Sequence, residues 1–208
     1  MHQTRAQVSK KIPIARKGTK YVARPLGDRE NSVPIVIAVR DMLHLAKTAK
    51  EVRKMIQQKL LKINGKEAKD YRDSIRLLSL FEADKTYILT LDPTRRFVLE
   101  ETKQKERPCK VVNKKVLKGK KIQLNLHDGS NILSDNKKIN TQDTIYLDAE
   151  SKIKKHLSFD KGRACLITRG RFIGQKGIVE KAEKNKVLVK IKNLDVETNL
   201  DKTGVILI

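Results

Sequence analysis

The sequence predicts an α+β chain made of several small domains: a basic, extended N-terminal arm, a small α/β domain and two β-rich modules. Apolar residues recur at helical spacing only between residues 32 and 59. From residue 86 onward, short runs of alternating apolar and polar residues are separated by turns that contain glycine or proline, which is typical of strands. With 208 residues, 38% hydrophobic residues and no Trp, the chain favours several small cores over one large core.

The charge of the chain indicates a polyanionic partner. Lys and Arg number 47 against 24 Asp and Glu, which gives a formal net charge of +23. A folded chain this basic repels itself, and a polyanion relieves that repulsion, whereas solubility alone requires only a modest net charge. Nucleic acid is therefore the first expected partner, and an anionic membrane surface is a distant second.

The chain is expected to be cytoplasmic and not to enter a membrane. The longest apolar run, residues 33–39, has seven residues and contains Pro34, so it is too short to cross a bilayer. The first five residues lack the apolar core of a secretory signal.

Residues 1–31 are expected to form an arm that orders on a polyanion. Their cations are interrupted by Pro13, Gly18 and Pro25, and no periodicity is sustained. Such a segment cannot bury enough apolar surface to order by itself. A solvated, unstructured terminus is the alternative, but Ile12 and Tyr21 interleave apolar groups with the charges and favour docking.

Two helices are expected next. Ser32 can cap the first helix, with Pro34 in its first turn, where a missing N–H costs nothing. Thr48 followed by Glu51 forms a capping box that begins the second helix, which is expected to run from residue 49 to about 59. The apolar face of the first helix would consist of Ile35, Val39, Met42, Leu43 and Ala46.

The second helix belongs to a strongly basic block, residues 47–66, which holds seven Lys or Arg and a single acid. Lys47, Lys50 and Lys54 form one stripe along the helix. Like charges at this spacing repel by a few tenths of a kcal/mol per pair, or roughly 0.2–0.5. For a generic helix a solvated face is the better interpretation, but an anion lying against the stripe would remove the repulsion.

The remainder of the chain is expected to be β. Residues 60–63 form a strand before Asn64-Gly65, a strong two-residue hairpin turn. Between residues 162 and 208 the alternation and three loop glycines suggest a small barrel, with Gly177 expected to need a positive φ. The other expected strands cover residues 75–81, 87–91, 96–99, 109–117, 121–126 and 144–148.

The sequence contains no pattern that indicates catalysis or metal binding. The two cysteines, Cys109 and Cys165, form no disulfide framework and are expected to be reduced. The histidines and cysteines lack metal-ligand spacing, and the acids are scattered among bases. We therefore expect no catalytic residue, no metal, no cofactor and no small-molecule substrate.

Two segments resemble known modules. Residues 36–66 resemble a small RNA-binding domain, two helices packed on a short sheet, that was first recognised in a bacterial small-subunit ribosomal protein. Residues 160–208 resemble a KOW module, an SH3-like β-barrel, through the strand at 164–167 and through Gly170, Gly174 and Gly177. The residues that carry the first resemblance are Ala46, Lys47, Thr48, Glu51, Arg53, Lys59, Ile63, Asn64, Gly65 and Lys66.

The order of the modules resembles the archaeal and eukaryotic small-subunit ribosomal proteins of type four over nearly the whole chain. The resemblance implies an arm over 1–31, an RNA-binding domain over 32–92, a central β domain over 93–159 and a KOW-type barrel over 160–208. It also implies a structural 16S rRNA binder in the small subunit, with neighbouring ribosomal proteins as partners, no enzymatic activity and no homo-oligomer. Gln142-Asp143 stands where these proteins usually have Gly-Asp.

The candidate RNA-binding residues are predicted to neutralise phosphates, because A-form RNA is recognised chiefly by its shape, phosphates and 2′-hydroxyls. No aromatic platform for stacking bases is evident on the basic block, so the reading of single strands is not expected. For the last three residues of the set, a solvated loop tip is an equal alternative. The set comprises Lys10, Lys11, Arg16, Lys17, Lys20, Arg24, Arg40, Lys47, Thr48, Lys50, Arg53, Lys54, Lys59, Asn64, Lys66, Arg169, Arg171 and Lys176.

Two other functions compete with this interpretation. The same two-helix domain is appended to RNA-modifying enzymes, and KOW modules occur in transcription factors. An enzyme needs a catalytic domain with a pocket and placed acids or nucleophiles. After residue 92 only 116 residues remain, and the two small β modules occupy them. A transcription elongation factor would be expected to bring a polymerase-contacting domain, for which no segment is evident.

Overall fold

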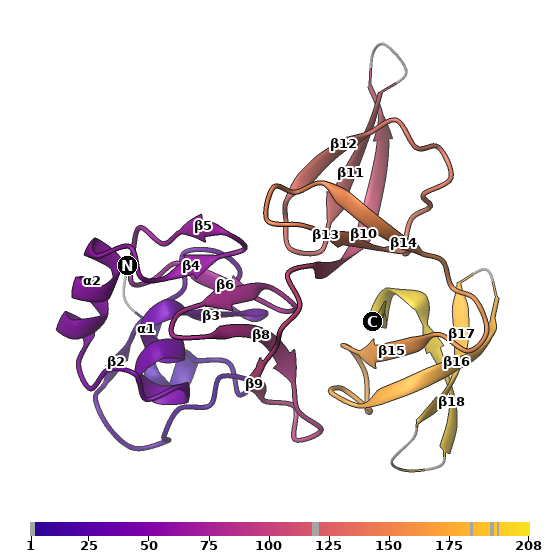
Figure 1. Cartoon of the computed structure of the whole chain (residues 1–208). Coiled ribbons are helices and arrows are strands. Elements are labelled where there is room, and N and C mark those ends of the chain that lie inside the picture. Colours follow the sequence, from indigo (N-terminus) through magenta and orange to yellow (C-terminus); the bar gives the residue numbers. More distant parts are fainter. Residues whose placement is uncertain (1–2, 118–120, 184, 192–193, 195) are drawn as a thin grey trace. The chain divides into compact units, whose positions relative to one another are not determined.

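The computed structural model describes residues 3–117, 121–183, 185–191, 194 and 196–208. The chain forms two compact units, Met1–Lys105 and Glu106–Ile208. The described residues are mostly β, with two short α-helices, α1 (Ile35–Ile37) and α2 (Ala49–Gln57), both in the first unit (Figure 1). Among these residues no helix is long and apolar enough to cross a membrane.

The main sheet of the first unit is antiparallel, with strand order β5-β4-β7-β8-β9. Its strands are β4 (Lys62–Ile63), β5 (Lys66–Glu67), β7 (Leu80–Glu82), β8 (Thr86–Leu91) and β9 (Phe97–Glu101). The predicted Asn64-Gly65 turn joins β4 to β5, with φ values of 52° and 78°. The domain boundary expected between residues 92 and 93 falls inside the β8–β9 hairpin.

The first predicted helix is present over residues 35–42, but it is wrong at its start and after Met42. Ser32 to Pro34 form strand β3, which pairs with β6 (Ser74–Arg76). Helix α1 is a single turn, and it continues as a π-helix, η2 (Ala38–Met42). Ser32 is buried and its hydroxyl donates to the carbonyl of Asp28, so it does not cap a helix. Residues 32–39 are all buried, and in such a continuous apolar run the helical period no longer identifies a helix.

The single strand predicted over residues 75–81 is also divided. Leu78 has a φ of 60°, in the left-handed region that interrupts a strand. As a result β6 and β7 lie in different sheets, one with β3 and the other with β4 and β8.

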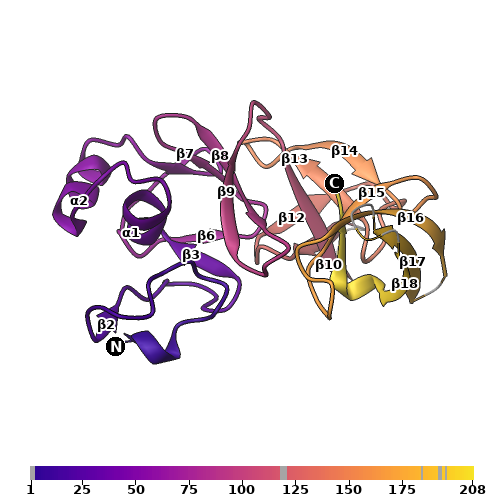
Figure 2. The same cartoon turned by 90° about the horizontal axis from the view of Figure 1, so that it is seen from below.

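The N-terminal segment is folded into the first unit, so the expectation of an arm without structure of its own is wrong. Strand β1 (Gln3–Thr4) pairs with β2 (Tyr21–Val22), and a 3-10 turn, η1 (Arg5–Gln7), follows β1. Figures 1 and 2 both show this segment on the α1 side of the unit.

Three contacts replace the large apolar core that this segment lacks. The Arg5 guanidinium donates through Nε to the Thr19 carbonyl at 3.0 Å, and it also donates to the Ala15 carbonyl. Ile12 is 4% exposed. The amide of Phe97 donates to the Lys11 carbonyl at 2.7 Å, which attaches the segment to β9. The Arg5 side chain thereby connects the start of the segment to residues 15 and 19, a contact that the sequence pattern does not predict.

The second unit contains two five-stranded antiparallel sheets (Figure 1), with strand orders β12-β11-β10-β13-β14 and β18-β17-β16-β15-β19. A bulge between Val111 and Asn113 allows β10 to pair with β13 at one end and β11 at the other. The pattern had not predicted β12 or β14. The strands are β10 (Arg107–Val116), β11 (Ile122–Leu126), β12 (Asn131–Ser134), β13 (Thr144–Leu147), β14 (Ile153–Leu157), β15 (Ala164–Ile167), β16 (Lys176–Ala182), β17 (Lys186–Ile191), β18 (Val196–Asp201) and β19 (Val205–Leu207).

Two backbone positions in this unit differ from expectation. Gly177 does not have a positive φ; Gly170 and Gly174 do, at 89° and 85°. Gly177 is required for another reason, because a Cβ there would lie 2.5 Å from Cγ1 of Val189. Gln142 has a φ of 76°, a conformation that glycine adopts without strain, and it occupies the position where the resembling proteins usually have glycine.

A buried lysine joins the two sheets of the second unit. Lys110, on β10, is 3% exposed, and its ammonium donates to the carbonyl of Val205 at 2.8 Å and to that of Lys202. Burial, reinforced by the charge of Arg169, lowers the pKa of Lys110 to about 7. The ammonium is therefore held by the dipoles of main-chain carbonyl groups.

We expect the stability of the protein to rise between pH 7 and pH 8.5. In that range the unfolded chain holds a proton on Lys110, whose usual pKa is 10.5, while the folded chain has lost it. The free energy of unfolding should then rise by up to about 1.4 kcal/mol per pH unit, as measured by urea denaturation followed by circular dichroism.

The control for this prediction is Lys110→Met, which should flatten the slope. The range stops at pH 8.5 because burial raises the pKa of the Cys109 and Cys165 thiols to about 12 and about 11. Above that pH the unfolded chain loses thiol protons that the folded chain keeps, so the free energy of unfolding falls. An equal slope in the parent and the variant would contradict the buried position of the ammonium.

Candidate nucleic-acid interface

Helix α2 begins as the sequence predicts. The Thr48 hydroxyl oxygen accepts a hydrogen bond from the amide of Glu51 at 3.3 Å, and the Glu51 carboxylate accepts one from the amide of Lys47 at 2.8 Å. The hydrogen bonds from Lys47 and Thr48 lower the pKa of Glu51. The only acid of the basic block thus serves the start of the helix.

Two residues of the predicted lysine stripe, Lys50 and Lys54, lie on the solvent face of α2, whereas Lys47 precedes the N-cap residue Thr48. Lys47, Lys50 and Lys54 are exposed. Val52 and Ile56 are buried on the opposite side of the helix. Because the acid of this block is engaged at the helix start, the stripe presents an almost uniformly positive face.

Arg53 leads to a residue that the sequence did not single out. Its guanidinium carbon lies 4.4 Å from the centroid of the Tyr71 ring, a cation–π distance. The backbone holds Tyr71 in place, because its carbonyl accepts from the amide of Val36 at 3.0 Å. The only signal in the sequence is an aromatic residue between Asp70 and Arg72, and it gives no indication of the contact.

Of the candidate residues in and near the hairpin, one stabilises the sheet and the others lie on the surface. The side-chain oxygen of Asn64 accepts from the amide of Leu80 at 2.9 Å, so its amide group helps to hold the sheet together. Lys59 pairs with Glu67 at 3.1 Å, at an exposed position where such pairs contribute little. Lys66 is exposed next to the turn.

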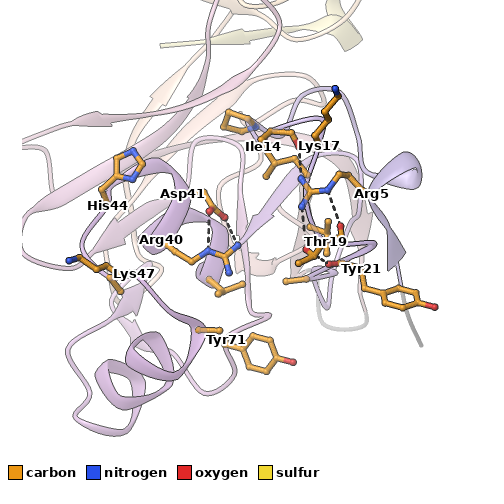
Figure 3. A pocket seen from close by; sticks show the side chains of 17 residues that line it. Arg5, Ile14, Lys17, Thr19, Tyr21, Arg40, Asp41, His44, Lys47 and Tyr71 are labelled. Carbon is orange, nitrogen blue, oxygen red and sulfur yellow. Dashed lines mark hydrogen bonds and ion pairs between the residues drawn. The ribbon is translucent and has the colours of Figure 1, made fainter.

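A groove of about 1020 Å³ lies between the N-terminal segment and the α1–η2–α2 region (Figure 3). Four cations line it, Arg5, Lys17, Arg40 and Lys47, with a single acid, Asp41. Asp41 accepts both hydrogen bonds of an Arg40 fork, at 2.9 and 2.8 Å. The remaining lining residues are Pro13, Ile14, Ala15, Thr19, Tyr21, Val22, Ala23, Val36, His44, Ala46, Ala49 and Tyr71.

The other predicted cations of the N-terminal segment differ in exposure. Lys10, Arg16, Lys17 and Lys20 are exposed, and the Lys20 ammonium lies 5.5 Å from the centroid of the Tyr21 ring. Lys11 and Arg24 are half-buried. The Lys11 ammonium donates to the side chain of Asn31 at 2.9 Å, so it is partly engaged within the unit.

The last three candidates, Arg169, Arg171 and Lys176, are exposed in the second unit. They border the loop that contains Gly170 and Gly174, and Arg171 lies 5.8 Å from the centroid of the Phe172 ring. They form a separate basic loop on that unit.

The titratable pairs of the second unit support its structure. His156 on β14 and Asp143 before β13 are joined at 2.7 Å, and a buried ion pair links Arg107 to Asp128. Each pair joins a strand to a residue that lies between strands: His156 on β14 to Asp143, and Arg107 on β10 to Asp128 between β11 and β12. Within the described ranges no three His, Cys, Asp or Glu residues are grouped as a metal site.

Comparison with known proteins identifies the family. The family model "Ribosomal family S4e" matches residues 83–153, the S4 domain matches 36–77 and the KOW motif matches 161–192. The small ribosomal subunit protein eS4 of Methanocella arvoryzae is 30% identical over 211 residues, which cover 95% of this chain and 90% of that protein. The chain belongs to the S4e family of ribosomal proteins.

Two further S4e proteins match this chain over most of its length. The eS4 protein of Archaeoglobus fulgidus is 32% identical over 219 residues, covering 99% of this chain and 93% of that protein. The crystal structure of the 30S ribosomal protein S4e from Thermoplasma acidophilum has the same fold, with a TM-score of 0.71, 24% identity, and coverage of 86% of this chain and 95% of that one.

The S4 match connects the site to the family. It extends from α1 through β6 and therefore includes the lysine stripe, the hairpin and Tyr71. The KOW match includes the loop that contains Gly170 and Gly174. The resemblance of the sequence to type-four small-subunit proteins is confirmed.

We expect the variant Thr48→Ala to lose about 1 kcal/mol of unfolding free energy, because it removes the acceptor of the Glu51 amide. Urea denaturation of the parent and the variant measures the difference. Thr48→Ser keeps the hydroxyl and should remain close to the parent. Equal stability of all three proteins would show that the cap does not hold the start of α2.

Proposed function

We propose that this chain is a structural, non-enzymatic protein of the small ribosomal subunit that binds and stabilises 16S rRNA through phosphate-dominated contacts. The single observation that supports this most strongly is the exposed Lys47, Lys50 and Lys54 stripe beside a cation-lined groove, within the S4 match of an S4e family member. The relatives named as small ribosomal subunit proteins support the assignment to the cytoplasmic ribosome.

The proposed mechanism is electrostatic. Each ammonium or guanidinium group that approaches a phosphate releases condensed counterions, which makes binding favourable at low salt. Lys50 and Lys54 lie on a helix whose start is held by its cap, so the backbone that carries them is in place before binding. Such a group of cations can contact the phosphates of a folded RNA without reading its bases.

The second unit is proposed to contribute a further contact. Arg169, Arg171 and Lys176 lie around a loop of the KOW match, which we expect to belong to a closed, SH3-like barrel. Together with neighbouring ribosomal proteins, this loop would fix the second unit on the subunit. We expect one copy of the chain per subunit, without homo-oligomers.

The first prediction concerns salt. If about 6–10 phosphates are neutralised, affinity for 16S rRNA should fall about 10³- to 10⁵-fold between roughly 50 and 200 mM salt. Filter binding of the purified full chain to 16S rRNA at several salt concentrations measures this slope. An affinity that does not change with salt would contradict the proposed phosphate contacts.

The second prediction concerns the stripe. The double variant Lys50→Glu and Lys54→Glu should remain folded, bind 16S rRNA more weakly and lower the salt slope by about two, or one for each lost phosphate contact. Circular dichroism checks the fold, and the binding assay above gives the slope.

The matched control is the double variant Lys152→Glu and Lys154→Glu, which changes the net charge equally. In the folded chain Lys152 lies 2.7 Å from Glu150 and Lys154 lies 3.7 Å from Asp148. This control should bind more tightly than the stripe variant. Equal losses in both double variants would mean that net charge, and not the α2 face, determines binding.

A further inference from the structure

We propose that the groove between the N-terminal segment and the α1–η2–α2 region receives an unstacked nucleotide of the RNA. The base would lie against Tyr71, and the adjoining sugar–phosphate chain would run onto the lysine stripe. The inference rests on the proposed function and adds to it the class of RNA feature that the protein recognises: an unpaired nucleotide within a folded RNA.

The size of the groove is the first argument. Its volume is about 1020 Å³, at the upper end of the range of roughly 300–1,000 Å³ that is typical of pockets for small organic ligands. A protein that contacts only phosphates on the surface of a duplex does not require a hollow of this size. A nucleotide extruded from its stack would fit within such a space.

The lining is the second argument, because it combines charge with apolar and aromatic surface. Arg5 and Lys17 lie on one bank and Arg40 and Lys47 on the other. Alanine, valine and proline side chains line the space between the banks. This mixture suits a nucleotide, which has an anionic phosphate, an apolar base face and a polar base edge.

The aromatic side chains are the third argument. Tyr71 and Tyr21 line the groove from opposite banks (Figure 3), and Tyr21 is 53% exposed. The guanidinium of Arg53 lies 4.4 Å from the centroid of the Tyr71 ring. Unpaired bases of RNA stack on aromatic rings and on guanidinium planes. The Tyr71 ring with Arg53 against it therefore offers a stacking surface next to the basic block, whose own residues 47–66 contain no aromatic side chain.

The groove is also continuous with the stripe. Lys47 lines the groove and is the first cation of the stripe. A strand that leaves the groove at Lys47 would pass next to Lys50 and Lys54. The net charge of the lining is positive, because its four cations outnumber its single acid, Asp41, which is paired with Arg40. A nucleic acid strand fits this path better than an acidic peptide, because stacking and phosphate contacts alternate along it.

The experiment compares two RNA hairpins that have the same loop and equal numbers of phosphates, one with a fully paired stem and one whose stem carries a single bulged 2-aminopurine. The full-length chain should bind the bulged hairpin at least about fivefold more tightly, because one base stacked on an aromatic ring supports that preference. The fluorescence of the bulged 2-aminopurine should change on binding as its stacking partner changes.

Variants assign the effect to the groove. Tyr71→Leu should remove the preference for the bulged hairpin over the paired one, and Tyr71→Phe should retain the preference. Lys50→Glu with Lys54→Glu should weaken the binding of both hairpins equally. If Tyr71→Leu fails to fold, Tyr21→Leu at the exposed position on the other bank should still reduce the preference.

The outcomes separate this inference from the proposed function. Equal affinity for the two hairpins, with salt-dependent binding and unchanged fluorescence, would overturn the inference and leave the proposed function in place. Binding of neither hairpin and of no 16S rRNA at low salt would overturn both. A preference for the bulge that persists in both leucine variants would place the base elsewhere and would also overturn the inference.

Discussion

The positive charge of this chain is the constraint on which the rest of its structure depends. Small β-rich cores can hold few charges, because burial of an isolated ion costs many kcal/mol, on the order of tens in a dry interior. Most of the 47 basic side chains must therefore remain on the surface, where only 24 acids are available. In the first unit, several of those acids are engaged in local contacts: Glu51 at the start of α2, Asp41 with Arg40, and Asp70 with Arg72.

The acids are placed so that charge accumulates on one region of the first unit. Glu51 is the only acid of the basic block, and it is engaged at the start of the helix. No other acid of that block is available to pair with the lysine stripe. The N-terminal segment adds Arg5 and Lys17 on the other side of the groove. Arg5 is itself held by carbonyl groups of residues 15 and 19, so it retains its charge while it closes the segment. The contacts that stabilise the fold here, the Glu51 cap and the Arg5 hydrogen bonds, therefore also leave the cations concentrated around the groove and α2.

Buried charges in the second unit have a different role. Arg107 and Asp128 form an internal pair, and Lys110 donates to main-chain carbonyls that include that of Val205. Burial raises the pKa of Asp128. The hydrogen bonds from Ser130 and the charge of Arg107 lower it, and together they outweigh the effect of burial, so the pKa lies below its usual value. These contacts connect strands distant in sequence, and we expect them to fix the register and the approach of the two sheets.

The local signals of the sequence predicted local structure well. The Thr48 and Glu51 capping box, the Asn64-Gly65 turn and the alternating strands of the second unit all appear in the fold. The lysine stripe was predicted from spacing alone, and the order of modules identified the family. The helix cap and the turn are determined by contacts between residues a few positions apart, and the strands are indicated by the alternation of neighbouring residues.

The sequence-based predictions that are wrong concern contacts between segments that lie far apart in the chain. Ser32 to Pro34 pair with Ser74 to Arg76, which converts the start of an expected helix into a strand. The N-terminal segment is ordered by Arg5 and by the bond between Lys11 and Phe97, and no periodicity reports either contact. Tyr71 reaches Arg53 only because the chain returns past Val36. The groove and its aromatic wall could therefore not be predicted from the sequence pattern.

The central claim is that the α2 lysines lie against RNA in the assembled subunit. Chemical acetylation of lysines, quantified by mass spectrometry, in the free protein and in intact small subunits tests it most directly. The account predicts strong protection of Lys50 and Lys54 in the subunit, which is lost when the RNA is digested, while Lys152 remains reactive. Equal acetylation of Lys50 and Lys54 in the free protein and in the subunit would contradict it.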